Sequence, residues 1–229
     1  ELQTVERAIS AYPDVISLIQ KAADCSDFYS DADYGVTFNE FVSNGLEEVQ
    51  FGRSVARYLH DRSLMLTAKG NRDEALEASI LCLQLARHLD HEPMLLSHLV
   101  ANAVRGIGVA SANRVLRSGP VAESARDALD GELARHDITE SYRHALITER
   151  AWGLTAFNEK NLGRYWPARG PWNNAVIYYL DVMDNQLDRA AQPYYQVQQA
   201  GPAVVSKSIS PWNVLADLLL PAIHAAREA

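Results

Sequence analysis

The order of apolar and polar residues along this chain predicts a protein made of α-helices. Apolar side chains recur at intervals of three and four positions, and no segment keeps the strict alternation that is typical of a half-buried strand. Residues 74–89 are apolar in almost every direction around a helical wheel. Because such a helix must be covered on several sides, we expect an all-α fold built around a buried helix at 74–89.

Turn-forming residues divide this pattern into about ten helices. Pro13 lacks the amide hydrogen that a helix interior needs, so it should split the first apolar stretch. Gly70 suits the left-handed residue after a helix end, and Thr139 suits an N-cap. Two segments should be irregular, at 24–45 and in an aromatic-rich loop at 160–172. The helices expected after Pro13 cover residues 46–69, 74–89, 94–117, 123–135, 139–158, 171–192 and 211–226.

The size of the chain favours one domain. With 229 residues, of which 48% are hydrophobic, it can bury a substantial core. Short connections between the predicted helices favour antiparallel hairpins. We therefore expect a single domain over residues 1–229, in which helical hairpins stack into either an α–α superhelix or an irregular bundle.

Charge and hydropathy narrow the range of partners. The net charge of -8 argues against non-specific binding to nucleic acid, which needs a basic surface. No run of about 18 consecutive apolar residues occurs, so we expect no membrane span within this chain. The chain begins in mid-pattern at Glu1, which leaves room for an upstream export signal or membrane anchor. Cys82 has the setting of a core residue and Cys25 lies in a polar stretch, and a disulfide between them is the alternative.

Part of the chain resembles a tetratricopeptide unit. Residues 56–93 carry alanine, glycine and acidic residues around a turn, and Pro93 closes the second helix. The tryptophan–leucine–glycine start of the motif is missing, and no second unit follows in register. Any antiparallel helix pair with a short loop is the simpler interpretation.

A wider resemblance is carried by three stretches of sequence. They read AKGNRDEALEASILCLQLARHLDHEP at 68–93, ALITERA at 145–151 and NVLADLLLPAI at 213–223. In this order they resemble an all-helical domain of planctomycete-type bacterial proteins, which usually follows a membrane segment. The resemblance implies an all-helical fold and an envelope or periplasmic location, and it implies no catalytic residue.

Glu149 is the first candidate for a functional residue. It lies at the centre of an apolar stripe formed by Tyr142, Ala145, Leu146, Gly153 and Ala156. A carboxylate on a buried stripe needs a partner or becomes neutral. Either it forms a structural ion pair with an arginine, or it lines a pocket with a raised pKa. The arginines considered as its partner are Arg105, Arg150 and Arg62.

Three polar residues share one side of the helix at 94–117. His98, Asn102 and Arg105 are four and three residues apart, opposite an apolar stripe that should face the core. They form either a solvated face or a face that meets Glu149 across the bundle. In the same helix, Gly106 and Gly108 indicate a close helix contact. The stripe expected to be buried contains Leu96, Leu99, Ala103, Ile107 and Ala110.

The loop at 160–172 has the composition of a binding hot spot. It contains Trp166, Arg169 and Trp172, which either pack onto the body of the protein or contact a partner. His88 and His91 suit helix C-terminal caps better than metal ligands, because their spacing differs from metal-binding patterns and no third ligand is near in sequence.

These observations favour a non-enzymatic interaction or scaffold module with a protein partner. Its binding face would include Arg105, His98 and the loop from Trp166 to Trp172. The alternative is a small-molecule-binding or enzymatic domain with Glu149 and an arginine in an internal pocket. We assign no catalytic residue, no metal ligand and no cofactor from the sequence.

Overall fold

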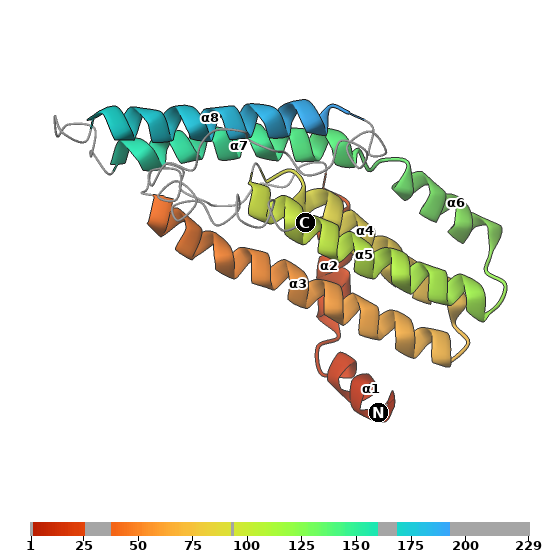
Figure 1. The fold of residues 1–229 in the computed structure, drawn as a ribbon. Coiled ribbons are helices and arrows are strands. Elements are labelled where there is room, and N and C mark those ends of the chain that lie inside the picture. The colour runs from red at the N-terminus through yellow and green to blue at the C-terminus, as the bar shows by residue number, and fades with distance from the viewer. Residues whose placement is uncertain (1, 26–37, 93, 160–168, 193–229) are drawn as a thin grey trace. The chain divides into compact units, whose positions relative to one another are not determined.

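The computed structural model describes residues 2–25, 38–92, 94–159 and 169–192, and these residues form eight α-helices and no strand (Figure 1). The all-α expectation is confirmed. By its internal contacts the chain divides into two compact units. Unit 1 comprises Glu1–Asp33 and Val42–Ser141, and unit 2 comprises Tyr34–Phe41 and Tyr142–Ala229. The single domain expected for residues 1–229 stays a prediction, and each unit is described by itself.

The first two helices of unit 1 are separated by Pro13. Helix α1 spans Leu2–Ser10 and α2 spans Asp14–Ala23. The predicted break at Pro13 is confirmed, since a proline cannot supply the amide hydrogen that a continuous helix would need there.

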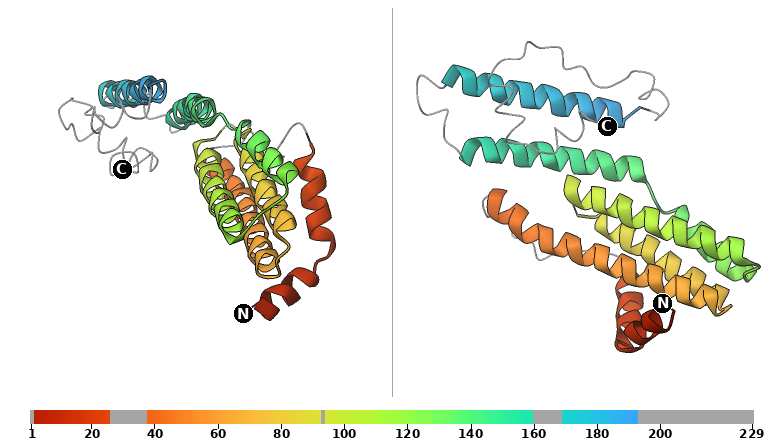
Figure 2. Two further views of the ribbon diagram at one scale, coloured as in Figure 1. Left: turned by 90° about the vertical axis from the view of Figure 1, so that its right-hand side faces the viewer. Right: turned by 60° about the horizontal axis from the view of Figure 1, so that its bottom comes forward.

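Three longer helices run alongside one another in unit 1 (Figures 1 and 2). They are α3 (Phe38–Ala68), whose first four residues are assigned to unit 2, α4 (Arg72–Leu89) and α5 (Leu95–Ser118). Gly70 has a φ of 85°, and Asn71 N donates to Leu66 O at 2.9 Å, a hydrogen bond that closes the end of α3. The irregular segment predicted at 24–45 is wrong for residues 38–45, which are helical, and residues 26–37 lie outside the described part.

Helix α4 is the inner helix, as predicted. Ten of its 18 residues are buried, and it contacts α2, α5 and the short helix α6 (Glu123–Leu133). It meets α3 through buried serines, because Ser63 Oγ donates to Ala75 O at 2.9 Å and lies 3.1 Å from Ser79 Oγ. One hydrophobic cluster of unit 1 includes Leu59, Cys82, Leu89, Ala101 and Val104, and a second includes Met65, Leu76, Leu83, Val115 and Leu129.

Helices α4 and α5 approach closely at a glycine. A Cβ atom on Gly108 would lie 2.9 Å from Leu83 Cδ2 and 3.4 Å from Leu83 N, so a larger residue would push the two helices apart. The close contact expected at this pair of glycines is confirmed for Gly108. Gly106, in contrast, faces open space, with no atom within 4 Å of an added Cβ.

The stripe of α5 that should be buried faces outward for most of its length. Leu99 is 53% exposed, Ala103 and Ala110 are also exposed, and the remaining two members of the stripe are half-buried. The prediction is wrong because α5 packs its small and polar side against α4. Residues of that inner side include Ser97, Ala101, Val104, Gly108, Ser111 and Ala112.

By length and composition, α5 is also the one helix among the described residues that could cross a membrane. Half of its most apolar window is buried inside the structure. The core helix of a soluble protein meets the same two criteria, so the finding is weak evidence for a span.

Unit 2 contains a helical hairpin. Helix α7 spans Ile138–Glu159, with its first four residues assigned to unit 1, and α8 spans Arg169–Ala190; they lie side by side (Figures 1 and 2). The N-cap is Asp137 and not the predicted Thr139, because Asp137 Oδ1 accepts a 2.9 Å hydrogen bond from Glu140 N. Residues 160–168 and 193–229, including the helix expected at 211–226, lie outside the described part.

Candidate functional site

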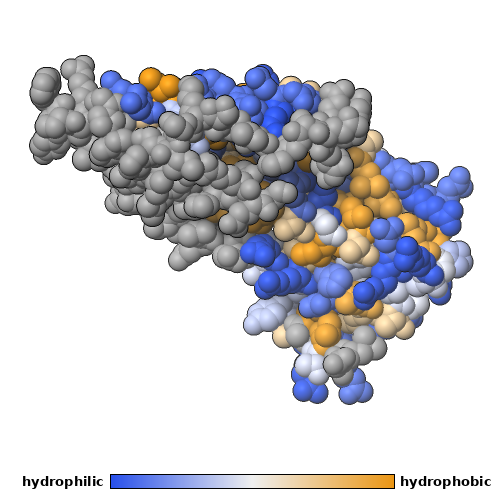
Figure 3. All heavy atoms as spheres, in the orientation of Figure 1, coloured by the Kyte–Doolittle hydropathy of each residue, from blue (hydrophilic) through white to orange (hydrophobic). Residues whose placement is uncertain are grey.

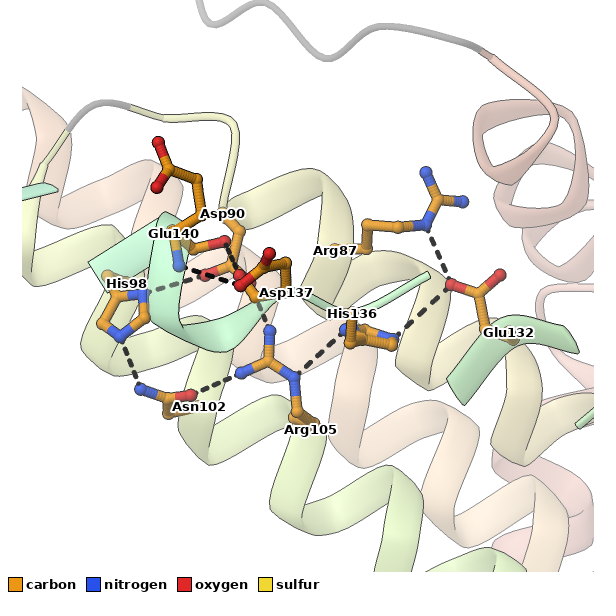
Figure 4. A network of polar contacts seen from close by, with 10 residues as sticks. Arg87, Asp90, His98, Asn102, Arg105, Glu132, His136, Asp137 and Glu140 are labelled. Carbon is orange, nitrogen blue, oxygen red and sulfur yellow. Dashed lines mark hydrogen bonds and ion pairs between the residues drawn. The ribbon is translucent and has the colours of Figure 1, made fainter. Parts of the chain in front are cut away.

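A closed ring of four polar side chains joins the end of α4 to α5 (Figure 4). Asp90 directly follows α4. One of its carboxylate oxygens lies 3.1 Å from His98 Nδ1, and the other accepts a hydrogen bond from the guanidinium of Arg105. Arg105 also donates to Asn102 Oδ1, and Asn102 Nδ2 lies 2.9 Å from His98 Nε2. The side chains of Asp90 and Arg105 are 7% and 9% exposed, so this is a buried ion pair.

The hydrogen bonds of this ring fix the protonation of His98. Arg105 has only donors, so the oxygen of the Asn102 amide must face it and the Asn102 nitrogen must donate to His98 Nε2. The proton of His98 therefore lies on Nδ1, which donates to Asp90. With His98 neutral, the ring contains one negative and one positive charge, and these lie next to each other.

The ring continues through His136 to the end of α6. Arg105 Nε donates to His136 Nδ1 at 3.1 Å, and His136 Nε2 lies 3.6 Å from Glu132 Oε1. Glu132 is 2% exposed and is paired with Arg87 Nε of α4 at 2.9 Å and with Arg135 at 3.3 Å. One polar network thus ties α4, α5 and α6 together.

This arrangement is suited to holding helices together. Most polar atoms of the ring are occupied by one another, and the charged side chains of Asp90 and Arg105 are buried. A buried charge that lacks its partner is strongly unfavourable, so each member keeps the others in place. We therefore interpret the network as a structural element that holds α4, α5 and α6 of unit 1 together.

The structure decides between the two interpretations of the polar side of α5. His98 and Arg105 are buried and Asn102 is half-buried, so the interpretation of these residues as a solvated face is wrong. The three residues do come together, but the carboxylate that neutralises Arg105 belongs to Asp90. Within unit 1, Asp90, Asn102 and His136 are the partners of its guanidinium, and the pairing of Arg105 with Glu149, which belongs to unit 2, stays a prediction.

The sequence analysis did not identify five members of the network, which are Arg87, Asp90, Glu132, Arg135 and His136. Two of them carry a usable signal: Asp90 directly follows α4 and Glu132 lies in the last turn of α6. The helix dipole disfavours a carboxylate at a C-terminal end. An acid in that position indicates a cation nearby, and the arginines of the network supply it here.

Glu149 lies in unit 2 on the stripe that the sequence predicts. Ala145, Leu146 and Gly153 on that stripe are buried, and Glu149 is half-buried. Burial raises the pKa of the Glu149 carboxyl group. Arg150 is paired with Asp184 of α8 at 3.1 Å, and among the described residues of unit 2 Glu149 has no ion pair. The expected salt bridge from Arg150 to Glu149 is therefore wrong.

The backbone of Glu149 anchors Tyr179 of α8. Tyr179 Oη donates to Glu149 O at 2.8 Å, and burial raises the pKa of the phenol above its ordinary range. This contact requires Gly153 on the next turn of α7, because a Cβ there would lie 2.1 Å from Tyr179 Oη. Gly153 thus allows the tyrosine ring to lie directly on the α7 backbone.

The predicted hot-spot loop is only partly described. Trp172 is half-buried and packs edge-on against Phe157, with 5.2 Å between the ring centroids, so this residue packs onto the α7–α8 hairpin. Trp166 lies outside the described residues, and Arg169 begins α8.

The histidines and cysteines have structural contacts. His88 lies in the last turn of α4, as predicted, and its Nε2 also lies 3.4 Å from Ala23 O at the C-terminal end of α2. Within the described part of the chain, no group of three or more His, Cys, Asp or Glu residues is placed to hold a metal ion. Cys25 and Cys82 are both free thiols, and burial raises the pKa of Cys82 to about 12.

Comparisons with protein-family models, with curated proteins and with solved structures found no match for this chain.

Proposed function

We propose that this chain is a non-enzymatic interaction module whose binding surface is the outward side of α5. This surface, called the α5 outer face below, consists of Leu99, Ala103, Gly106, Val109 and Ala110. All five residues are exposed. The partner that fits it best is an amphipathic helix of another protein.

The observation that carries this proposal is the position of Gly106. A glycine inside a helix costs about 0.5–1 kcal/mol relative to alanine. The packing of unit 1 gives no steric reason for it, because no atom lies within 4 Å of an added Cβ. A second helix could approach α5 most closely at this point, between the small side chains of Ala103 and Ala110.

Larger apolar side chains surround these small residues. Leu99 is 53% exposed, Val109 40% and Leu116 37%. Hydrophobic side chains also reach the surface, among charged ones, in the view of Figure 3. Full burial of such a side chain contributes about 1.5–3 kcal/mol, so the half-exposed residues leave about 1 kcal/mol each for a partner to gain.

Charge indicates what kind of helix would bind. From Leu99 to Asn113 the one charged residue of α5 is the buried Arg105, whereas Arg114 and Arg117 are exposed in its last turns. A complementary partner has an apolar stripe with carboxylates at the end that lies over these two arginines. A second copy of α5 is a poor match, because this helix contains no acidic residue.

A library of displayed helical peptides, selected on the full chain, provides the test. We expect the selected peptides to carry an apolar stripe and carboxylates near one end. Gly106→Ala should raise the stability of the protein by up to about 1 kcal/mol and yet weaken binding at least about fivefold through the closer steric contact. Gly131→Ala is the matched control, because Gly131 is also a helical glycine in open space, on α6.

The two glycine variants should differ in their effect on binding. Gly131→Ala should leave peptide affinity unchanged, and charge reversal of Arg114 and Arg117 should lower it. The proposal is overturned if Gly106→Ala binds the peptides as well as wild type. Dimerisation through α5, or binding of α5 to lipid vesicles in place of peptides, would also overturn it.

Glu149 supports a second candidate function, the binding of a small molecule. Its half-buried carboxyl group has a raised pKa and no ion pair among the described residues of unit 2. Such a group can donate or accept a hydrogen bond in a ligand site. A fragment screen by ligand-observed NMR tests this: fragments that bind wild type and not Glu149→Gln support the site, and a screen without such fragments rejects it.

A further inference from the structure

Helix α6 is attached to the rest of unit 1 by one side, which packs against α4. Of its eleven residues, Leu129 and Glu132 are buried. Leu129 packs into a hydrophobic cluster of unit 1, and Ala122 N, before the first turn, donates to Asp73 Oδ1 at 2.8 Å. The C-terminal end is held by Glu132 and by His136, which follows the helix.

His136 makes its contact with α5 only when its ring is neutral. Arg105 Nε is a donor, so the lone pair of His136 Nδ1 must be free to accept the 3.1 Å hydrogen bond. The proton of the neutral ring then lies on Nε2, which faces Glu132 Oε1 at 3.6 Å. A second proton on Nδ1 would point at the Arg105 N–H, remove this hydrogen bond and set two cations against each other (Figure 4).

We propose that His136 is a proton-sensitive latch, which holds the end of α6 on α4 and α5 when neutral and releases it when protonated. The latch goes beyond the proposed binding role, because it concerns α6 and not the α5 outer face. Two histidines act on α6 among the described residues: His136 through its contacts with Arg105 and Glu132, and His88 through its charge, which interacts with Glu132.

Charged groups face His136 from three helices. Arg87 faces it from α4, Asp90 from the residue directly after α4, Arg105 from α5 and Glu132 from α6. Arg135 adds a positive charge beside Glu132. The two carboxylates favour the protonated ring, and Arg87 and Arg105 oppose it. The ring is 4% exposed, and burial is the largest influence, so the pKa of His136 is lowered.

The direction of the pH effect follows from this lowered pKa. The docked state prefers the neutral ring, while a released His136 has an ordinary pKa of about 6.5. Docking is therefore at full strength above that pH and weakens as the pH falls below it. Release should be confined to α6, since α4 and α5 keep their own packing.

The proton on His136 can be observed directly. Long-range ¹H–¹⁵N correlation of the full-length protein at about pH 7.5 distinguishes the two neutral tautomers. We expect the Nε2–H form. Finding the Nδ1–H form, or a protonated ring, would overturn the proposal even if every variant failed to fold.

Hydrogen exchange of the α6 amides tests the release. After correction for the intrinsic rate, their protection should fall in wild type between about pH 7.5 and about pH 5.5. His136→Gln should remove the part of this pH response that is due to His136, because a glutamine oxygen accepts from Arg105 and does not titrate. His144→Gln, at an exposed histidine of α7, is the control and should respond like wild type.

Each result decides the question. A wild-type α6 whose protection is independent of pH, or a His136→Gln protein that responds like wild type, would overturn the latch. His88, whose pKa is also lowered by burial, is present in every variant, so its titration cancels from the comparison.

Discussion

Removal of Arg105 should destabilise unit 1 far more than removal of an exposed cation. Arg105→Met leaves the Asp90 carboxylate, which is 7% exposed, with His98 as its one remaining partner in the ring. Breaking a buried ion pair by removing one member costs about 3–5 kcal/mol. Asn102 Oδ1 and His136 Nδ1 also lose a donor, so we expect a loss toward the upper end of this range.

Urea unfolding followed by far-UV circular dichroism measures this loss. The double variant Asp90→Leu/Arg105→Met removes both charges and should be less destabilised than the sum of the single variants, by at least about 2 kcal/mol. Lys69→Met is the control, because the pair of Lys69 with Glu6 is 37% and 45% exposed. We expect this control to lose no more than about 1 kcal/mol.

The reasoning fails if Arg105 and Asp90 behave independently. Additive losses, within about 0.5 kcal/mol, would show that the two groups do not depend on each other. A loss for Arg105→Met as small as that of the Lys69 control would show that the guanidinium lies in solvent.

Three further predictions concern the packing of individual helices. Gly153→Ala should destabilise the α7–α8 hairpin by about 1–3 kcal/mol, because the added Cβ meets the Tyr179 ring. Tyr179→Phe should relieve part of this loss. Tryptophan fluorescence measures the unfolding of unit 2, since all four tryptophans lie in that unit. Glu149→Gln should stabilise unit 2 at neutral pH. The raised pKa of Glu149 favours the protonated acid in the folded state, so the wild-type protein loses stability as the pH rises above about 4.5. An unchanged or lower midpoint of unfolding in urea would contradict this prediction. Gly108→Ala should lower the melting temperature by crowding Leu83, and a rise equal to that of an exposed helical glycine would contradict the close contact.

The inner helix and several helix limits could be predicted because each depends on local sequence. A helix that is apolar on all sides has few alternatives to burial, and α4 is indeed surrounded. Pro13 and Gly70 act through the backbone itself, so their effect requires no knowledge of the rest of the fold.

The orientation of α5 could not be predicted because apolar residues occur on both of its sides. Its core side is lined by small residues such as Ala101 and Gly108, which contribute little to a hydropathy pattern but allow α4 to come close. The polar residues beside them resemble a solvated face until their partner is known. That partner, Asp90, directly follows the preceding helix α4, and only the fold brings it to Arg105.

The candidate site could be predicted only as far as it depends on the spacing of residues within one helix. The stripe around Glu149 follows from helical spacing alone and is confirmed at Ala145, Leu146 and Gly153. The prediction of an arginine partner for Glu149 required knowledge of which helices are neighbours. Arg150 instead reaches Asp184, which lies on a different helix.

Thiol labelling of α5 tests the central claim, that its apolar stripe faces outward and its polar side is buried. Leu99→Cys and Val104→Cys are each made in a Cys25→Ser background, and the native proteins are treated with an alkylating reagent. The remaining cysteine, Cys82, is buried. We predict that Leu99→Cys reacts nearly as fast as in urea and that Val104→Cys reacts at least about a hundredfold more slowly, since it needs local opening. Fast labelling of Val104→Cys together with protection of Leu99→Cys would contradict the account.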